Sequence, residues 1–137
     1  MGKILVTGGC GYIGSHVVLT LSNAGESVIV FDNLTQGSKS ALINGGVLVE
    51  GDIRDKNALA QVMNNNDIEI VIHLAALVNA AESVSKAELY NEVNSIGSRI
   101  VWECAINAQV KHIIYASSAA VYGTPANSDP INESSAT

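Results

Sequence analysis

Cysteine, proline and positive charge are scarce in this chain of 137 residues, and long hydrophobic runs are missing. Its two cysteines, Cys10 and Cys104, lie far apart and outside any metal-binding spacing, so we expect reduced thiols and no metal site. Seven Lys and Arg against thirteen Asp and Glu give a net charge of −6. That balance disfavours nucleic acid as a partner, because binding to a phosphate backbone needs clustered cations. No apolar run approaches the roughly 18 residues of a membrane span and no signal peptide is evident, so we expect no membrane partner and a cytoplasmic location.

Apolar, β-branched runs alternate with helical patterns along the chain, and 47% hydrophobic residues suffice for one globular domain. The runs predict strands buried on both faces at residues 4–6, 28–31, 47–50, 69–73 and 112–116. Helices are expected at residues 12–23, at 56–64 after the N-cap Asp55, and at 82–108, with loops at 33–46 and 124–137. This alternation predicts an α/β fold of Rossmann type, with a doubly wound parallel sheet of strand order 3-2-1-4-5.

Glycines recur at every third position where the first predicted strand meets the first helix. Gly8, Gly11 and Gly14 follow the apolar run 3–7 and overlap the start of the helix. The pattern is typical of a dinucleotide cradle, in which the glycines permit a tight turn, close approach of a pyrophosphate and close packing of helix on strand. The free N–H groups of the first helical turn then face the phosphates.

An acidic residue follows the second predicted strand. Asp32 comes 18 residues after Gly14, where a carboxylate can accept hydrogen bonds from both hydroxyls of an adenosine ribose. Its charge also repels a 2′-phosphate, so we expect NAD rather than NADP as the cofactor. The alternative is a strand-end aspartate that caps its own turn through Asn33.

Two further strand ends carry candidate ligands. Asp52, after the third strand, can accept a hydrogen bond from the adenine amino group while Ile53 covers the ring; a solvated turn is the alternative. The fourth strand ends in the small residues 73–76, which let backbone run beside a dinucleotide. We expect His73 itself to be a core histidine with satisfied hydrogen bonds rather than a catalyst.

The fifth predicted strand leads into the paired serines Ser117 and Ser118. In a parallel sheet this is the edge at which side chains reach the ligand crevice. A hydroxyl at Ser118 can donate to a sugar oxygen as that oxygen gains or loses a proton. The alternative is that both serines cap a turn.

These motifs stand in the order and spacing of the extended short-chain dehydrogenase/reductase family, and the chain resembles its NAD-dependent nucleotide-sugar epimerases and dehydratases. The segments that carry the resemblance are 7–16, 32–34, 51–55, 73–76, 82–84, Asn94 with Gly97, and 117–123. The resemblance implies NAD as the cofactor, a UDP-hexose as the partner of the complete enzyme, and a sheet that is incomplete relative to the full family domain.

The resemblance also implies a role for each candidate site residue. It places the pyrophosphate on Gly8, Gly11, Tyr12, Ile13 and Gly14, the ribose on Asp32 and Asn33, the adenine on Asp52 and Ile53, the inner part of the dinucleotide on Leu74, Ala75 and Ala76, and the nicotinamide on Asn94 and Ser117. Ser118 matches the catalytic hydroxyl, which shares the proton transfer while C4 of the sugar is oxidised and reduced again.

The sequence departs from the family pattern at two places. Val78 stands where the epimerases commonly carry a lysine, and the family's Tyr-x-x-x-Lys helix has no counterpart in residues 1–137. We therefore interpret the chain as a truncated NAD-binding domain, without the nucleotide-sugar domain, that binds NAD but does not turn substrate over. The alternatives are a dehydratase fragment, disfavoured by Ala119-Ala120 where that family carries Asp-Glu, and a non-catalytic module that senses NAD.

Two large apolar residues lie off the core face of the predicted long helix. The face expected on the sheet contains Val93, Gly97, Ile100, Val101, Cys104 and Ala108. Trp102 and Ile106 fall on the opposite side, beside Ser95 and Arg99. Because the resembled family dimerises through helices of this region, we expect a homodimer with Trp102 near the centre of its interface. A single exposed tryptophan is the alternative.

Overall fold

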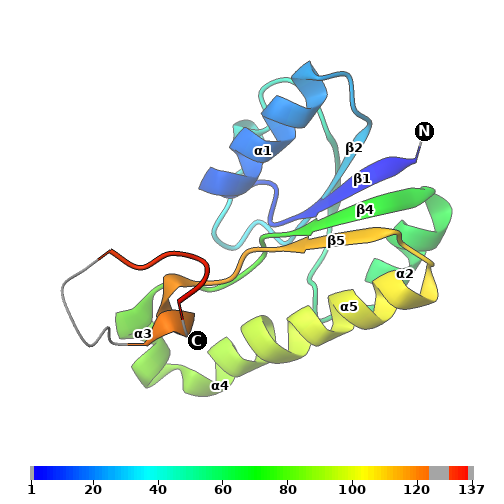
Figure 1. Ribbon diagram of the computed structural model, residues 1–137. Helices are drawn as coiled ribbons and strands as arrows, with labels where there is room; N and C mark the ends of the chain where they lie inside the picture. The colour runs from blue at the N-terminus through cyan, green and yellow to red at the C-terminus, as the bar shows by residue number, and fades with distance from the viewer. Residues whose placement is uncertain (1, 124–129, 136–137) are drawn as a thin grey trace.

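A parallel five-stranded sheet forms the centre of the computed structural model, which describes residues 2–123 and 130–135 (Figure 1). Its strands lie in the order β3-β2-β1-β4-β5. Their bounds are β1 Lys3–Thr7, β2 Val28–Asp32, β3 Val47–Glu50, β4 Ile68–His73 and β5 His112–Tyr115. The predicted fold class and strand order are confirmed, and the strand ends differ from the expected ones by at most one residue.

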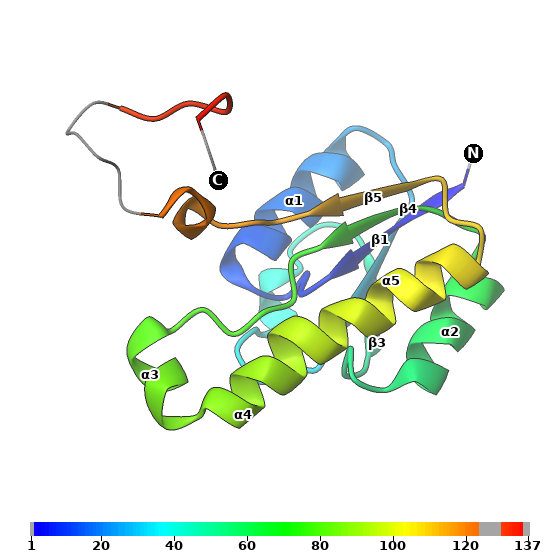
Figure 2. The same cartoon turned by 60° about the horizontal axis from the view of Figure 1, so that its bottom comes forward.

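Helices cover both faces of the sheet (Figures 1 and 2). α1 (Tyr12–Asn23) packs on one face, while α2 (Lys56–Asn65) and α5 (Ser98–Asn107) pack on the other. β1 contributes to both cores because successive side chains of a strand point to opposite faces. Ile4 and Val6 pack with Val18 of α1, whereas Leu5 packs with residues of α2 and α5. This two-sided burial explains why β1 is a continuous apolar run.

Local sequence sets the ends of α1 and α2 as predicted. The Asp55 carboxylate accepts hydrogen bonds from the backbone N–H groups of Asn57 and Ala58 and so caps α2. α1 ends at Asn23, with Ala24 as its C-cap. Gly25 follows at a φ of +84°, a left-handed conformation that favours glycine after a helix. Between β2 and β3 there is only the short 3₁₀ turn Lys39–Ala41, as expected for that loop.

The single helix predicted for residues 82–108 is wrong. The structure has α3 (Ala80–Ser85), α4 (Ala87–Tyr90), a π-helical segment (Asn91–Gly97) and α5 in its place. The chain leaves helical geometry at Lys86, which has a φ of −123° and a ψ of 39°. That bend brings α4 back toward α3, and the Tyr90 hydroxyl donates to Glu82 Oε2 at 2.9 Å. α3 and α4 extend past the carboxyl ends of the strands (Figure 2).

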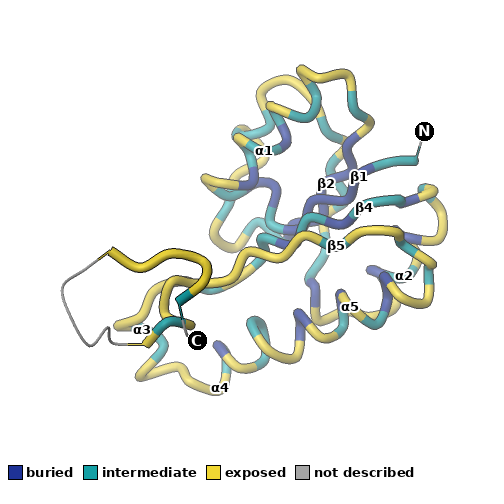
Figure 3. Tube along the Cα trace, in the orientation of Figure 1, coloured by how far each residue is buried: buried dark blue, intermediate teal, exposed yellow. Residues whose placement is uncertain are grey.

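Burial on both faces holds for the central strands but is wrong for the two edge strands. Every residue of β2 is buried, whereas β3 and β5 contain exposed residues, with Ile114 of β5 at 56% exposure. Figure 3 shows β5 as largely exposed along its length. An edge strand has a neighbour on one side only, and apolar composition alone does not reveal which strand lies at the edge.

The predicted core face of α5 is confirmed. Gly97, Val101 and Cys104 are buried, and Val93, Ile100 and Ala108 pack against the same core. Trp102 and Ile106 lie on the outer side with 39% and 70% exposure.

Within residues 2–123 and 130–135, no helix is long and apolar enough to cross a membrane. The same part of the chain contains no cluster of His, Cys, Asp and Glu suited to a metal ion. Of the loop predicted for residues 124–137, positions 130–135 contain neither helix nor strand, and the rest lies outside the described residues.

Candidate functional site: a dinucleotide cavity

The glycine turn joins β1 to α1 in the conformation expected for a phosphate cradle. Gly8 has a φ of +71°, and a Cβ added there would lie 2.7 Å from the backbone nitrogen of Ala75. A Cβ on Gly14 would collide with the carbonyl oxygen of Gly8. Gly11 begins α1 without a side-chain cap, so the helix presents its first N–H groups at the turn. These features are typical of a turn that binds an anion.

Asp32 ties the end of β2 to this turn. Its Oδ2 accepts from the backbone nitrogen of Cys10 at 2.9 Å, and its Oδ1 accepts from that of Leu34 at 2.8 Å. The carboxylate therefore caps its own turn through Leu34 rather than Asn33. An ionised carboxylate has about four acceptor positions, so two remain for a ligand. Burial and, secondarily, the charge of Asp32 raise the pKa of the Cys10 thiol to about 11, which keeps that thiol neutral.

Asp52 is held by two neighbours at the end of β3. Arg54 donates to it through its backbone nitrogen and two guanidinium nitrogens, and Asn33 Nδ2 donates at 3.0 Å. These hydrogen bonds, chiefly those from the Arg54 side chain, hold the pKa of Asp52 well below its usual range. The carboxylate caps its own turn through Arg54, and 27% of its side chain is exposed. The turn considered as the alternative therefore stays open beside the adenine role. Ile53 is buried at 5% exposure.

Asn94 fixes the segment that follows β4. Its Oδ1 accepts from the Leu77 backbone nitrogen and its Nδ2 donates to the Leu77 carbonyl, both at 2.8 Å. Asn94 therefore acts on the backbone beside the cavity instead of lining it. Leu74 N donates to the Thr7 carbonyl at 3.1 Å, which holds the other end of this segment against β1.

His73 is a core histidine, as expected. It is 2% exposed, with Nδ1 2.6 Å from Thr7 Oγ1 and Nε2 2.9 Å from Ser98 Oγ. Burial lowers its pKa to about 4, so the ring is neutral at pH 7.

Ser118 caps the short 3₁₀ turn Ala119–Tyr122, accepting from Ala120 N at 3.1 Å. Both Ser117 and Ser118 are exposed. Turn capping, the alternative interpretation, is thus one function of Ser118; its hydroxyl proton remains able to donate.

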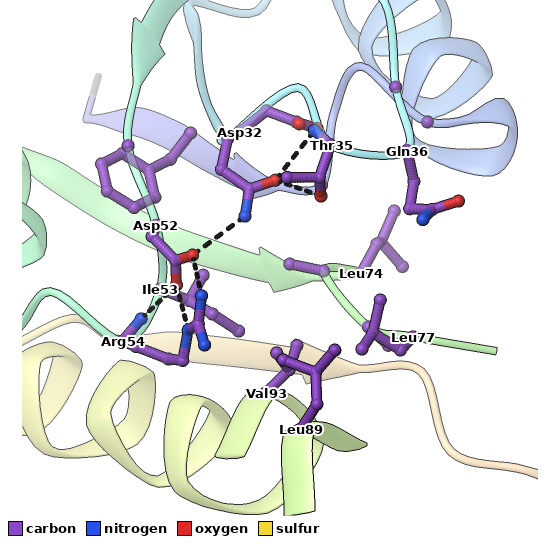
Figure 4. A pocket seen from close by; sticks show the side chains of 18 of the residues that line it. Asp32, Thr35, Gln36, Asp52, Ile53, Arg54, Leu74, Leu77, Leu89 and Val93 are labelled. Carbon is purple, nitrogen blue, oxygen red and sulfur yellow. Dashed lines mark hydrogen bonds and ion pairs between the residues drawn. The ribbon is translucent and has the colours of Figure 1, made fainter. Parts of the chain in front are cut away.

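The carboxyl ends of the strands enclose a cavity of about 260 Å³ (Figure 4). It brings together nine predicted site residues: Gly8, Gly11, Asp32, Asn33, Asp52, Ile53, Leu74, Ala75 and Ala76. Tyr12, Ile13, Gly14, Asn94, Ser117 and Ser118 do not line it. Figure 4 shows Leu89 and Val93 pointing into the cavity across from Asp32 and Thr35.

Sequence reasoning missed several lining residues. Leu89 and Val93 come from the broken helix, and their spacing of four residues could have indicated a shared face. Arg54 could have been found from its position two residues after Asp52, which suits a local ion pair. Thr35 and Gln36 lie in a loop whose composition gave no indication of a ligand.

A glycine turn, a strand-end aspartate and a cavity at the carboxyl edge of a parallel sheet define a dinucleotide-binding α/β domain. A family model described as "NAD dependent epimerase/dehydratase family" matches residues 4–137. The chain belongs to this family, whose cofactor is NAD.

Similar proteins come from several bacteria. The chain is 45% identical over 134 residues to UDP-glucose 4-epimerase of Halalkalibacterium halodurans, covering 98% of the chain and 40% of that protein. It is 44% identical over 137 residues to the Bacillus subtilis enzyme, covering 95% and 40%. The chain thus spans about 40% of the length of these curated relatives.

Solved structures show the same similarity. UDP-glucose 4-epimerase from Brucella ovis in complex with NAD superimposes with a TM-score of 0.93 at 36% identity, covering 99% of this chain and 41% of that one. The Bifidobacterium longum enzyme in complex with NAD⁺ and UDP gives 0.90 at 35% identity, covering 98% and 42%. The chain matches the NAD-binding portion of these enzymes.

Proposed function

We propose that the whole protein interconverts UDP-glucose and UDP-galactose, in galactose metabolism in the cytoplasm, and that this chain contributes its NAD site. The proposal is supported by curated relatives that are UDP-glucose 4-epimerases and by neighbours solved with NAD. NAD, when bound, supplies the reversible hydride acceptor for oxidation at C4 of the sugar. The 137 residues alone bind NAD without turnover, because no tyrosine among them is followed by a lysine four positions later.

The residues of the cavity fit the parts of the dinucleotide in order. The pyrophosphate lies on the glycine turn of residues 8–14, where a Cβ at Gly8 would fill the space next to Ala75. Ile53, Leu89 and Val93, which line the cavity, would hold the adenine. Asp52 accepts from the adenine amino group.

Residues 74–76, Ser117 and Ser118 would hold the remaining part of the dinucleotide, and Asn94 holds the backbone at Leu77. Ser118 is the hydroxyl that shares the proton with the sugar. Its oxygen accepts from Ala120 N, which leaves the O–H group free to donate. The protein acts as a homodimer through the outer face of α5.

Asp32 carries the proposal, because it is a buried carboxylate at the cavity with two acceptor positions left for ribose hydroxyls. We expect the chain to bind NAD at least tenfold more tightly than NADP. Asp32→Ala removes charge-assisted hydrogen bonds of about 1.5–3 kcal/mol and lowers NAD affinity by roughly ten- to a hundredfold. Isothermal titration calorimetry with both dinucleotides measures this.

The matched control is Glu50→Ala, since Glu50 ends β3 beside Asp32 in the sheet and does not line the cavity. That variant should bind like the unchanged chain. Equal affinity of the unchanged chain for NAD and NADP, or an Asp32→Ala variant with unaltered NAD affinity, contradicts the assignment of Asp32 to the ribose.

A further inference from the structure

The Asp52 carboxylate has a hydrogen-bond donor at each of its four acceptor positions. The four donors differ in how strongly they bind and in how easily a ligand can replace them. Oδ1 accepts from Arg54 N and Arg54 Nε, both at 2.9 Å. Oδ2 accepts from Arg54 Nη2 at 2.8 Å and from Asn33 Nδ2 at 3.0 Å. Three positions thus belong to Arg54, and a carboxylate offers about four in all. A ligand can reach this carboxylate only by replacing one of these donors.

Arg54 is the donor that is hardest to replace. Its guanidinium makes two parallel hydrogen bonds to Asp52, and its third nitrogen, Nη1, donates to Glu92 Oε2 at 3.1 Å. Glu92 lies in the π-helical segment Asn91–Gly97. Bidentate charge-assisted pairs are stronger and better oriented than neutral hydrogen bonds. Figure 4 shows Arg54 beside Asp52, among the side chains that line the cavity.

Asn33 is the donor that can leave. Its amide is neutral, so its hydrogen bond to Asp52 is weaker than those from the guanidinium. Its Oδ1 accepts from Thr35 N at 3.1 Å and from Thr35 Oγ1 at 2.8 Å. The exchange therefore requires the amide to turn away from Asp52 against these two hydrogen bonds. The group it presents is an NH₂ on a trigonal carbon, the same arrangement as the exocyclic amino group of adenine.

We propose that Arg54 is a positioning residue for base recognition: it holds Asp52 with one exchangeable acceptor position, which Asn33 fills in the free protein and the 6-amino group of the purine takes on binding. This inference rests on the proposed function, since it requires NAD in the cavity. The low pKa of Asp52, caused first by the Arg54 side chain, keeps the acceptor ionised. The other charged groups that line the cavity are Asp32, Glu82 and Lys86, and Glu82 pairs with Lys86. Glu92 pairs with Arg54 without lining the cavity.

The test compares NAD with nicotinamide hypoxanthine dinucleotide, in which a carbonyl oxygen replaces the 6-amino group. Titration calorimetry on the 137-residue chain should show that NAD binds roughly tenfold more tightly than the hypoxanthine dinucleotide. This ratio of dissociation constants corresponds to the free energy of one charge-assisted hydrogen bond. Arg54→Met should lower this ratio to about threefold or less. Arg54→Lys should act in the same direction, because an ammonium group cannot make the two parallel hydrogen bonds.

Asn33→Ala should keep the full preference, because the base occupies that acceptor position when bound. Arg99→Met is the matched control, since Arg99 pairs with Glu103 on α5 away from the cavity. If Arg54→Met does not fold, Glu92→Gln keeps Arg54 and should reduce the ratio by about twofold through a freer guanidinium.

The outcomes separate the inference from the proposed function. Equal loss of affinity for both dinucleotides in Arg54→Met, with the ratio unchanged, means that Arg54 is merely structural and overturns the inference. If Asn33→Ala no longer prefers NAD over the hypoxanthine dinucleotide, the proposed replacement of Asn33 by the base amino group on Asp52 is overturned. If the unchanged chain binds neither dinucleotide, the proposed function itself fails, and the inference with it.

Discussion

At the residue scale, His73 shows how a buried polar group is accommodated at the end of a central strand. Both ring nitrogens have hydroxyl partners, Thr7 from β1 and Ser98 from α5. The ring therefore links the sheet to the helix that covers it. Protonation would place a charge in this buried position, which is why burial lowers the pKa to about 4.

We expect stability to fall as the pH drops from about 6.5 toward 4. A histidine with a depressed folded-state pKa contributes its full stability above the unfolded pKa and loses it as pH falls toward the folded value. For His73 this contribution is roughly 3 kcal/mol. Chemical unfolding at several pH values should show that the free energy of unfolding depends less steeply on pH in His73→Gln than in the unchanged chain. His112→Gln, at an exposed histidine, should retain the dependence of the unchanged chain, and an unaltered slope in His73→Gln contradicts the prediction.

At the element scale, the π-helical segment Asn91–Gly97 connects the helix to the cavity at several points. Glu92 pairs with Arg54, Asn94 binds the Leu77 backbone, and Gly97 lies so close to Ile53 that an added Cβ would be 2.8 Å from its Cδ1. π-helical turns are rare and occur frequently at functional sites. Here the segment holds both the turn after β3 and the segment after β4.

Asn94→Asp tests this positioning. The carboxylate can still accept from Leu77 N but faces the Leu77 carbonyl without a donor, so we expect a loss of about 1–3 kcal/mol in the free energy of unfolding. Amide exchange at Leu77 should accelerate, and NAD affinity should fall. Asn91→Asp makes the same change at an exposed position of the same segment and serves as the control. Unchanged exchange at Leu77 would show that Asn94 does not hold this backbone.

At the scale of the whole molecule, apolar surface gathers where β5 meets α5. Trp102 lies with its ring 6.3 Å from that of Tyr115, and Ile106 is 70% exposed one turn further along α5. Ile114 of β5 is 56% exposed but points to the other face of the sheet, beside Ile72, and is not part of this surface. Contiguous exposed apolar residues mark an interaction surface more often than isolated ones do.

We expect the chain to form a homodimer through this face of α5. Sedimentation velocity at micromolar concentration should show a dimer for the unchanged chain and a monomer for Ile106→Glu and Trp102→Glu. Ile106→Glu is the cleaner change, because Trp102 also contacts β5. Ile43→Glu alters a similarly exposed isoleucine in the loop between β2 and β3, outside α5, and should remain dimeric. A monomeric unchanged chain, or a dimeric Ile106→Glu variant, excludes this interface.

The sequence by itself determined the strand order, the glycine turn, the acidic strand ends and the role of His73. Each depends on a local pattern: continuous apolar runs predict buried central strands, and a carboxylate after such a run lies at the ligand edge of the sheet. The N-cap at Asp55 is likewise a contact within three residues. Local hydrogen bonds and periodic burial can be predicted from the sequence, because they depend on the types and spacing of neighbouring residues.

Only the tertiary structure decided the break at Lys86, the exposure of β5 and the hydrogen bonding of Asp52. The Arg54–Glu92 contact joins residues 38 positions apart, and the Asn33–Asp52 contact joins residues 19 apart. No spacing rule encodes such pairs, because they depend on how the sheet and helices bring separate strand ends together. The same holds for Asn94, which sequence similarity placed at the nicotinamide and the structure places on the Leu77 backbone. A polar side chain binds whichever partner the packed backbone presents to it, and that partner is fixed only when the chain has folded.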